Sequence, residues 1–367
     1  MHGSENIKIY LQPLGILRGC IASSAVKSGQ ARWLAGGALA FNMVRIIFRK
    51  YGARCREELV PISRLDHVIT DLTPVQQQEI SEILHRICGD RTTMIYQDAT
   101  DFTWQRPLIQ GIVNVTPDSF SDGGRYDTKK QAVDHARDLI AEGADIIDIG
   151  GESTRPGATR VSIEEELERV IPVIEALSDI SVPLSVDTRN GDVMAAAIKA
   201  GATMINDVSA LSHDSEALGH MAAEDCPVIL MHAQNAPETM QHNPRYNDVV
   251  LDVYDYLEQR LSVCEGAGIR RDRLIIDPGI GFGKTVDHNI ALMANLSLLH
   301  GLGVPLLLGV SRKRFIGQIC KETAADGRLA GSLAFGQAGY DQGVQILRVH
   351  DVRQSRQARD CWAAVKY

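Results

Sequence analysis

Apolar and polar residues follow a new pattern from about residue 107 onward. Short, continuous runs of Val, Ile and Leu are separated by longer stretches in which apolar residues recur at helical spacing. Continuous apolar runs of this length are typical of strands that are buried on both faces. The runs cover residues 108–115, 145–149, 183–186, 203–208, 227–231, 274–276, 305–310 and 345–349.

The stretches between these runs predict helices. Ser162 and Glu165 have the spacing of a capping box, which marks the start of a helix. Gly143 and Gly201 follow two other helical patterns, at the position where glycine often ends a helix. The helical patterns cover residues 132–140, 162–174, 193–200, 290–299, 328–340 and 352–365.

Strand and helix alternate in this way eight times in about 260 residues, which predicts a single (β/α)8 barrel over residues 104–367. A doubly wound open sheet is the alternative. It is less consistent with the chain, because no G-x-G-x-x-G turn follows the first strand. We therefore expect an α/β protein of the TIM-barrel class.

Residues 1–103 do not continue this alternation. They contain a mixed segment at 32–50 and a helical pattern at 74–87 that follows Thr73, and they predict a small N-terminal extension of mixed α/β character. The apolar stretch at 33–48 contains Arg45 and is shorter than the roughly 20 residues that a membrane-spanning helix needs, so we expect a buried helix or strand there. This part of the sequence contains no catalytic constellation, and its role stays open.

Composition narrows the classes of partner. The chain has 46 Asp and Glu residues against 38 Lys and Arg, a net charge of −8, which gives it no general attraction for nucleic acid or anionic lipid. Its seven cysteines are spread out without a C-x-x-C pair, so neither a disulfide framework nor a zinc site is expected. No signal-peptide pattern opens the sequence. These features favour a cytoplasmic protein that does not bind nucleic acid or membranes.

Polar residues stand at the end of every predicted strand, where barrels carry their functional groups. Burying so many polar groups without partners would cost about 1–3 kcal/mol each, so a mouth that collects them is expected to bind a polar ligand. The residues, in chain order, are Asn114, Asp148, Asp187, Asn206, His232, Asp277, Lys313, Arg348 and His350.

Two parts of such a ligand can be inferred. Arg312, Lys313 and Arg314 follow the seventh predicted strand, and Arg348 and His350 follow the eighth, where barrels commonly bind phosphate. We therefore expect a phosphorylated anion at these strands. The carboxylates and amides of the middle strands could accept paired N–H bonds from a flat heterocycle, with a lysine donating to its carbonyl group.

The segment 279–285 follows a predicted strand and ends in Gly-Lys-Thr, as a phosphate-binding P-loop does. The P-loop pattern needs glycine where this chain has Pro278. An ATP-hydrolysing function is therefore not expected.

Four segments carry a resemblance to a known family. They are Asn-Val-Thr-Pro-Asp-Ser-Phe-Ser-Asp-Gly-Gly at 114–124, Gly-Gly-Glu-Ser-Thr-Arg-Pro-Gly at 150–157, Asp-Pro-Gly at 277–279 and Ser-Arg-Lys at 311–313. They are similar to motifs of the dihydropteroate synthase family of folate biosynthesis, over about residues 107–367. The resemblance implies a transferase that condenses 6-hydroxymethyl-7,8-dihydropterin diphosphate with p-aminobenzoate. It also implies Mg²⁺ as cofactor, a homodimer and inhibition by sulfonamides.

The resemblance also implies roles for single residues. Asn114 would help to place Mg²⁺ on the diphosphate, and Phe282 would lie beside p-aminobenzoate. Asp187, Asp277, Lys313 and Asn114 would form the catalytic set, as electrostatic and binding groups and not as nucleophiles. The substrate-binding set would be Asp148, Asp187, Asn206, Asp277, Lys313, Arg348, His350, Phe282 and the loop residues Thr154, Arg155 and Pro156, with Asp118 and Ser119 in the first loop.

The chain departs from the family pattern at Ala233, Asn235, Ile280 and Arg314, which are expected at the rim of the pocket. Two alternatives stay open. A pterin-binding methyltransferase would share the Asp/Asn set, but would not need the loop at 114–124 or the Ser-Arg-Lys run. A non-catalytic pterin-binding homologue would not need Asn114, Arg348 and His350.

Overall fold

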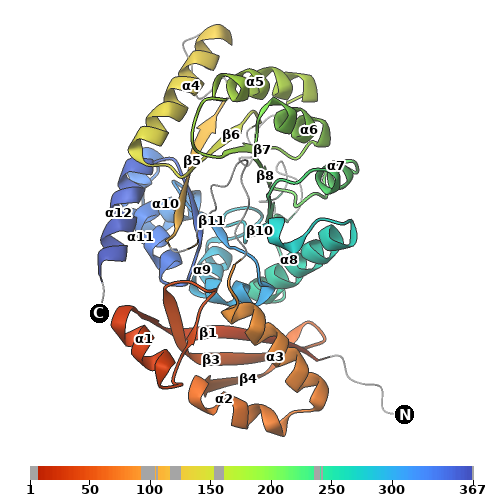
Figure 1. Ribbon diagram of the computed structural model, residues 1–367, viewed down its shortest axis with the longest axis vertical. Coiled ribbons are helices and arrows are strands. Elements are labelled where there is room, and N and C mark those ends of the chain that lie inside the picture. Colours follow the sequence, from red (N-terminus) through yellow and green to blue (C-terminus); the bar gives the residue numbers. More distant parts are fainter. Residues whose placement is uncertain are drawn as a thin grey trace.

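The computed structural model describes residues 7–91, 104, 106–115, 125–152, 161–234, 240 and 243–365, and for residues 125–127 it describes the backbone alone. Figure 1 shows a barrel with a ring of helices, and a smaller part made of a sheet and helices that lies against one side of it. The smaller part is the N-terminal domain, residues 7–91.

The barrel sheet consists of eight parallel strands in the described residues, in the order β10-β9-β8-β7-β6-β5-β12-β11. A parallel bridge between Ile276 and Leu306 joins the two outer strands and closes the barrel. The predicted TIM-barrel fold is thus confirmed, and each strand lies within one or two residues of its apolar run. The strands are β5 (Leu108–Asn114), β6 (Ile146–Gly150), β7 (Leu184–Asp187), β8 (Met204–Asp207), β9 (Val228–Met231), β10 (Leu274–Asp277), β11 (Leu307–Gly309) and β12 (Ile346–Val349).

Helices alternate with these strands. The predicted helix start at Ser162 is confirmed, since its side chain accepts a hydrogen bond from the Glu165 N–H at 3.2 Å. Gly201 ends its helix with a φ of 117°, a left-handed conformation in which glycine has no steric penalty. The helices are α4 (Arg125–Glu142), α5 (Ile163–Ala176), α6 (Gly191–Ala200), α7 (Ala217–Ala223), α8 (Val249–Gly266), α9 (Val286–Ala294), α10 (Arg314–Cys320), α11 (Leu329–Tyr340) and α12 (Val352–Ala364).

The single helix predicted at 290–299 is wrong in its second half. Helix α9 ends at Ala294, and the 3-10 helix η4 (Leu296–Leu302) follows it. Asn295 separates the two, and its side chain donates to the Ala291 carbonyl at 2.7 Å, which competes with continuation of the helix. The 3-10 helices η3 (Arg271–Arg273) and η5 (Asp326–Arg328) precede β10 and α11.

Two apolar layers support the barrel. The larger one fills the space between the strands and the surrounding helices. The smaller one lies inside the barrel and forms a floor beneath its mouth, because paired residues of neighbouring strands point to the same face. It contains Leu108, Ile146, Met204, Ile229, Ile275, Leu307 and Ile346.

The N-terminal domain is an antiparallel sheet whose helices pack in two separate clusters, consistent with the predicted mixed α/β character (Figure 1). Its central strand β3 pairs with the other three, and most of the apolar stretch at 33–48 falls in this strand. The capping box of Thr73 starts helix α3 at Pro74. The elements are β1 (Lys8–Arg18), α1 (Gly19–Lys27), β2 (Arg32–Trp33), β3 (Leu39–Lys50), β4 (Ala53–Pro61), α2 (Ile62–Val68), the 3-10 helix η1 (Ile69–Asp71) and α3 (Pro74–Cys88).

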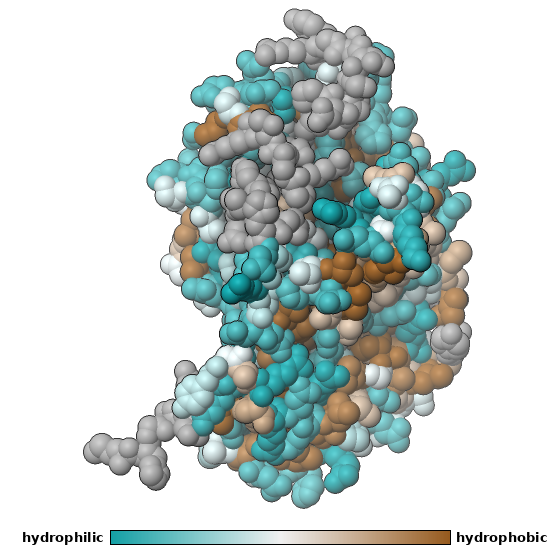
Figure 2. All heavy atoms as spheres, turned by 180° about the vertical axis from the view of Figure 1, so that it is seen from behind, coloured by the Kyte–Doolittle hydropathy of each residue, from teal (hydrophilic) through white to brown (hydrophobic). Residues whose placement is uncertain are grey.

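The two faces of this sheet belong to different cores. Ile9, Leu11 and Ile46 pack into a core within the domain, whereas Tyr10 and Ile47 point the other way and belong to the large core of the barrel. Figure 2 shows the molecule from behind, with hydrophobic side chains gathered close to the junction of the two parts. The N-terminal domain is therefore packed against the barrel through part of one face of its sheet, since Leu59 on the same face is 62% exposed. Among the described residues, no helix has the length and apolar character needed to span a membrane.

Candidate active site

The polar residues at the strand ends meet at one end of the barrel. Strand register places Asp187 beside Asn206 and opposite Gly150, and it places Arg348 beside Gly309. Because side chains of paired positions point to the same face of a sheet, these groups all project into the barrel above its apolar floor. Short apolar strands with Asp187, Asn206, Asp277 and Arg348 as their last or second-last residue thus build a polar mouth on an apolar base.

Arg348 is the centre of a buried ionic cluster in this mouth. Its Nε donates to Asp148 Oδ2 at 2.6 Å, and its Nη2 donates to Asp187 Oδ2 at 2.8 Å. Asn206 Nδ2 donates to the same Asp148 oxygen at 3.0 Å. The Asp148 side chain is 0% exposed. Burial acts to lower the pKa of Arg348, but the two carboxylates outweigh it and raise that pKa, so the guanidinium stays charged.

Both carboxylates keep one oxygen for a further partner. Asp148 Oδ1 and Asp187 Oδ1 are buried and have no hydrogen-bond partner among the described residues. Burial, reinforced by the charge of Asp148, raises the pKa of Asp187 to about 7 against the opposing effect of Arg348. Buried acceptors without donors are costly, so this cluster fits a ligand that brings N–H donors into the mouth.

Asp277 and Lys313 form the second charged pair. Asp277 Oδ1 accepts a hydrogen bond from the Gly279 N–H at 2.7 Å, and burial raises the pKa of this carboxyl while Lys313 opposes the rise. Lys313 Nζ donates to the Ile280 carbonyl and lies 4.7 Å from the centre of the Phe282 ring. Burial lowers the pKa of Lys313 to about 8, with Asp277 acting in the opposite direction. The lysine therefore lies between a carboxylate and an aromatic face.

Lys284 has a role that the sequence did not suggest. Its side chain is 3% exposed, and Nζ donates to the carbonyls of Gly279 at 2.8 Å and Phe282 at 2.9 Å. It also contacts His232 Nδ1 at 2.9 Å. Burial lowers the pKa of both side chains well below their ordinary values. Lys284 of the P-loop-like segment 279–285 thus stabilises its own loop by hydrogen bonds. In the sequence, only the Gly-Phe-Gly-Lys spacing indicated an unusual loop.

The cations after β11 and β12 differ in their surroundings. Arg312 pairs with Asp351 through two donors, at 3.0 and 2.6 Å, and it also contacts Asp326. The backbone N–H of His350 donates to Ser311 Oγ at 3.1 Å, and its ring Nδ1 lies 3.0 Å from the same atom. Arg348 and His350 therefore border the mouth. Arg312 is paired with carboxylates and so does not belong to the expected anion-binding cluster. Arg314 is exposed.

Comparison with known proteins identifies the family of the chain. The sequence pattern of the family described as pterin binding enzyme matches residues 110–350. Dihydropteroate synthase of Escherichia coli strain K12 is 47% identical over 265 residues, which cover 72% of this chain and 93% of the relative. That of Neisseria meningitidis serogroup B is 49% identical over 267 residues, 71% and 93% of the two chains. The chain belongs to the pterin-binding enzyme family.

Solved structures of the family agree with this membership. The Xanthomonas albilineans dihydropteroate synthase with 4-aminobenzoic acid is 50% identical, with a TM-score of 0.69 over 72% of this chain and 95% of that one. The same enzyme in complex with 7,8-dihydropteroate is 48% identical, with a TM-score of 0.66. The predicted family, its barrel and its transferase class are thus confirmed, and the family match begins only at residue 110, beyond the N-terminal domain.

Part of the family-derived residue set lies outside the described residues: Thr154, Arg155, Pro156, Asp118, Ser119 and the departure Asn235. Asn114 is described. It ends β5, and its Oδ1 borders the Gly150 backbone from one side as Asp187 does from the other. The roles of all these residues stay predictions.

Proposed function

We propose that the mouth of this barrel binds 6-hydroxymethyl-7,8-dihydropterin diphosphate and p-aminobenzoate and joins them, with the pterin in the Arg348 cluster. The reaction is that of the dihydropteroate synthases, which yields 7,8-dihydropteroate and diphosphate in folate biosynthesis. One observation supports the pterin position above all: two buried carboxylate oxygens, Asp148 Oδ1 and Asp187 Oδ1, have no donor among the described residues. The amino-pyrimidine edge of a pterin supplies N–H donors in one plane, as these oxygens require.

The other strand-end groups complete this pterin site. Asp277 and Asn206 offer a carboxylate and an amide to the remaining ring edge, and Lys313 is placed to donate to the ring carbonyl. Asn206 is already oriented by its bond to Asp148. The site therefore selects a flat, polar heterocycle, and the guanidinium of Arg348 borders it from the side of β12.

The chemistry follows from charge. The C–O bond between the pterin methylene and the diphosphate breaks, and its electron pair leaves with the diphosphate. The positive charge that develops on the methylene is shared with the pterin ring, where the carboxylates of Asp187 and Asp277 stabilise it. The amine nitrogen of p-aminobenzoate then forms the new C–N bond and loses a proton to solvent. Arg348 and His350 would hold the departing anion, so no protein nucleophile is needed.

Asn114 fits the proposed Mg²⁺ role. The described residues contain no group of three His, Cys, Asp or Glu side chains that could enclose a metal ion. Magnesium is commonly held by one or two protein oxygens together with substrate phosphates, and Asn114 Oδ1 is such an oxygen at the end of β5. When bound there, Mg²⁺ would neutralise charge on the diphosphate and so improve it as a leaving group.

The proposed p-aminobenzoate site lies on the side of Phe282 and Lys313, and the loop at 154–156 would complete it. Phe282 supports this position, because its aromatic ring can pack against the ring of p-aminobenzoate next to Lys313, whose Nζ lies 4.7 Å from the centre of the Phe282 ring. A homodimer and a cytoplasmic location rest on the family resemblance and on the composition.

Turnover tests the function directly. Purified protein is incubated with the dihydropterin diphosphate, p-aminobenzoate and Mg²⁺, and 7,8-dihydropteroate is detected by chromatography and mass spectrometry. We expect product that depends on both substrates and is suppressed by a sulfonamide. Absence of product from well-folded protein would favour the non-catalytic homologue instead.

A further inference from the structure

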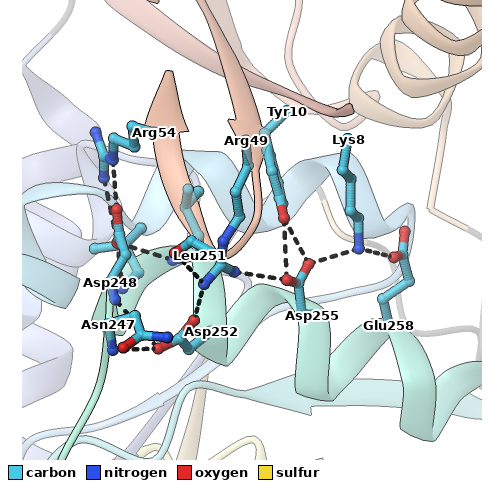
Figure 3. A network of polar contacts seen from close by, with 12 residues as sticks. Lys8, Tyr10, Arg49, Arg54, Asn247, Asp248, Leu251, Asp252, Asp255 and Glu258 are labelled. Atoms are coloured by element: carbon cyan, nitrogen blue, oxygen red, sulfur yellow. Dashed lines mark hydrogen bonds and ion pairs between the residues drawn. The ribbon is translucent and has the colours of Figure 1, made fainter. Parts of the chain in front are cut away.

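The N-terminal domain contacts helix α8 through a row of opposite charges. Asp248, Asp252, Asp255 and Glu258 lie at spacings of three and four residues, which places them on one side of the helix. Basic side chains from the sheet of the N-terminal domain point at this row (Figure 3). The pairs are Arg54 with Asp248, Arg49 with Asp252 and Asp255, and Lys8 with Asp255 and Glu258.

The two arginines reach the first turn of α8 and the backbone before it. Arg54 donates to both oxygens of Asp248, the residue that caps the helix by accepting from the Val250 and Leu251 N–H groups at 3.1 and 3.2 Å. Arg49 donates to Asp252, whose other oxygen accepts from the backbone N–H groups of residues 247 and 248 at 2.9 and 3.2 Å. The hairpin β3–β4 thus holds the backbone where the chain enters α8.

That backbone belongs to residues 243–248, which we call the brace segment. Its Tyr246 hydroxyl donates to the Gly283 carbonyl at 2.8 Å. The Tyr246 ring also meets the ring of His288 edge-on, with centroids 4.9 Å apart. A second tie joins Arg245 to Gln234 by a pair of hydrogen bonds of 2.9 and 3.2 Å. The brace segment therefore connects the N-terminal domain to residues 279–284, which we call the pocket loop.

The pocket loop has little freedom to move on its own. Gly283 has a φ of +60°, and a Cβ there would stand 2.7 Å from the Gln234 carbonyl oxygen, so its backbone is pressed against the loop that follows β9. Lys284 holds the carbonyls of Gly279 and Phe282 from within. A shift of the brace segment would therefore move Gly283 and, with it, the neighbouring Phe282.

We infer that the N-terminal domain is a positioning domain for the active site: Arg49 and Arg54 hold the brace segment, which in turn sets the position of Phe282 in the pocket loop. Neither arginine touches the mouth of the barrel, so both act through other residues. The inference rests on the proposed position of p-aminobenzoate beside Phe282. It assigns a role to the part of the chain that lies outside the family match.

The same interface offers a matched control. Lys8 pairs with Asp255 and Glu258, further along α8, and makes no contact with residues 247 and 248. Arg54→Ala and Lys8→Ala each remove one cation from the domain interface. Only Arg54→Ala loosens the start of α8.

The test measures steady-state kinetics with both substrates. We expect Arg54→Ala to raise KM for p-aminobenzoate by about 2- to 30-fold, the range over which distant residues modulate a site, with a smaller effect on KM for the dihydropterin diphosphate. Lys8→Ala should leave both constants unchanged. Tyr246→Phe, which removes the bond to Gly283, should raise the same KM, and the double variant Arg54→Ala/Tyr246→Phe should show less than the product of the two single effects.

Several results would overturn the inference. The first is an unchanged KM for p-aminobenzoate in Arg54→Ala together with a lower urea midpoint. The second is a rise of this KM in Lys8→Ala as large as in Arg54→Ala. The third is a rise of KM in the double variant that equals the product of the rises in Arg54→Ala and Tyr246→Phe. Hydrogen exchange of the pocket loop supplies a readout that does not depend on turnover, and it should increase in Arg54→Ala but not in Lys8→Ala. If the unmodified protein forms no dihydropteroate while hydrogen exchange of the pocket loop responds as expected, the proposed function is wrong, but the positioning role of the N-terminal domain is retained.

Discussion

Two ionisable side chains of the mouth have pKa values close to neutrality. Burial raises the pKa of Asp187 to about 7 and lowers the pKa of Lys313 to about 8. In the pH range between these values, a large share of the free protein has the carboxylate and the ammonium together. A pterin donates N–H hydrogen bonds to a carboxylate and accepts one at its ring carbonyl from an ammonium, so it would bind best in this pH range.

This pattern predicts a bell-shaped pH profile for pterin binding. Below about pH 7 Asp187 is protonated and loses acceptor capacity, so affinity should fall as pH falls; above about pH 8 Lys313 loses its charge, so affinity should fall again as pH rises. Fluorescence titration with 6-hydroxymethylpterin measures this without the ionisation of a diphosphate. A flat profile from pH 5.5 to 9 would contradict the assigned contacts.

Replacing the charge of Asp187 is the sharper test of its role. Asp187→Asn keeps the size of the side chain but replaces a carboxylate acceptor, and charged hydrogen bonds contribute about 1.5–3 kcal/mol each. We expect kcat/KM for the dihydropterin diphosphate to fall about 100-fold or more, with an unchanged circular dichroism spectrum. Asp179→Asn, at an exposed ion pair with Arg137, is the control and should retain full activity. Near-normal turnover in Asp187→Asn would remove Asp187 from the pterin site.

At the scale of elements, the strands were predictable and the contacts between loops were not. Most barrel strands are apolar runs with a polar residue at or next to their end, so local sequence defines both the strand and the group that it delivers to the mouth. Helices α7, α8 and α10 were missed; α8 opens with the apolar run Val249, Val250 and Leu251, although its later buried residues Val253, Leu257, Leu261 and Cys264 recur at helical spacing. The orientation of the Lys284 side chain depends on His232, which follows β9, and the pairing of Arg348 with Asp148 joins residues 200 apart in sequence. Such pairs follow from the closed barrel and not from local pattern.

The pocket loop supplies the prediction at this scale. Lys284→Met retains most of the side-chain volume but removes the donors to three carbonyls, those of Gly279, Phe282 and His232, and each buried acceptor left without a partner costs about 1–3 kcal/mol. We expect the free energy of unfolding to fall by about 2–4 kcal/mol, as measured by urea denaturation, and KM for p-aminobenzoate to rise. The exposed Lys199→Met should change neither quantity. A stable Lys284→Met protein with normal kinetics would show that the loop does not depend on this lysine.

At the scale of the whole molecule, the N-terminal domain and the barrel share buried side chains. Tyr10 and Ile47 are 0% and 1% exposed and pack with the barrel core, and the Tyr10 hydroxyl donates to Asp255 of α8 at 2.8 Å. The Tyr10 ring meets Tyr254 edge-on with centroids 5.2 Å apart. Gln12 and the Pro13 carbonyl bond to Ser297 of η4. A junction with both apolar packing and buried polar bonds should couple the stabilities of the two parts.

This coupling predicts a single cooperative unfolding transition that one substitution can divide. Ile47→Ala removes buried contacts at the junction and leaves the other face of β3 intact, and such truncations cost about 2–5 kcal/mol. We expect the N-terminal domain of this variant to unfold at lower urea concentration than the barrel, because the weakened junction no longer couples the unfolding of the two parts. Hydrogen exchange with mass spectrometry resolves the two parts by peptide. Ile46→Ala, on the opposite face of the same strand, should instead destabilise the domain from its own core.

Since the domain holds the brace segment, the Ile47→Ala protein should also lose affinity for p-aminobenzoate at urea concentrations where the barrel is still folded. If its activity persists until the barrel itself unfolds, the domain is not needed to position the pocket loop.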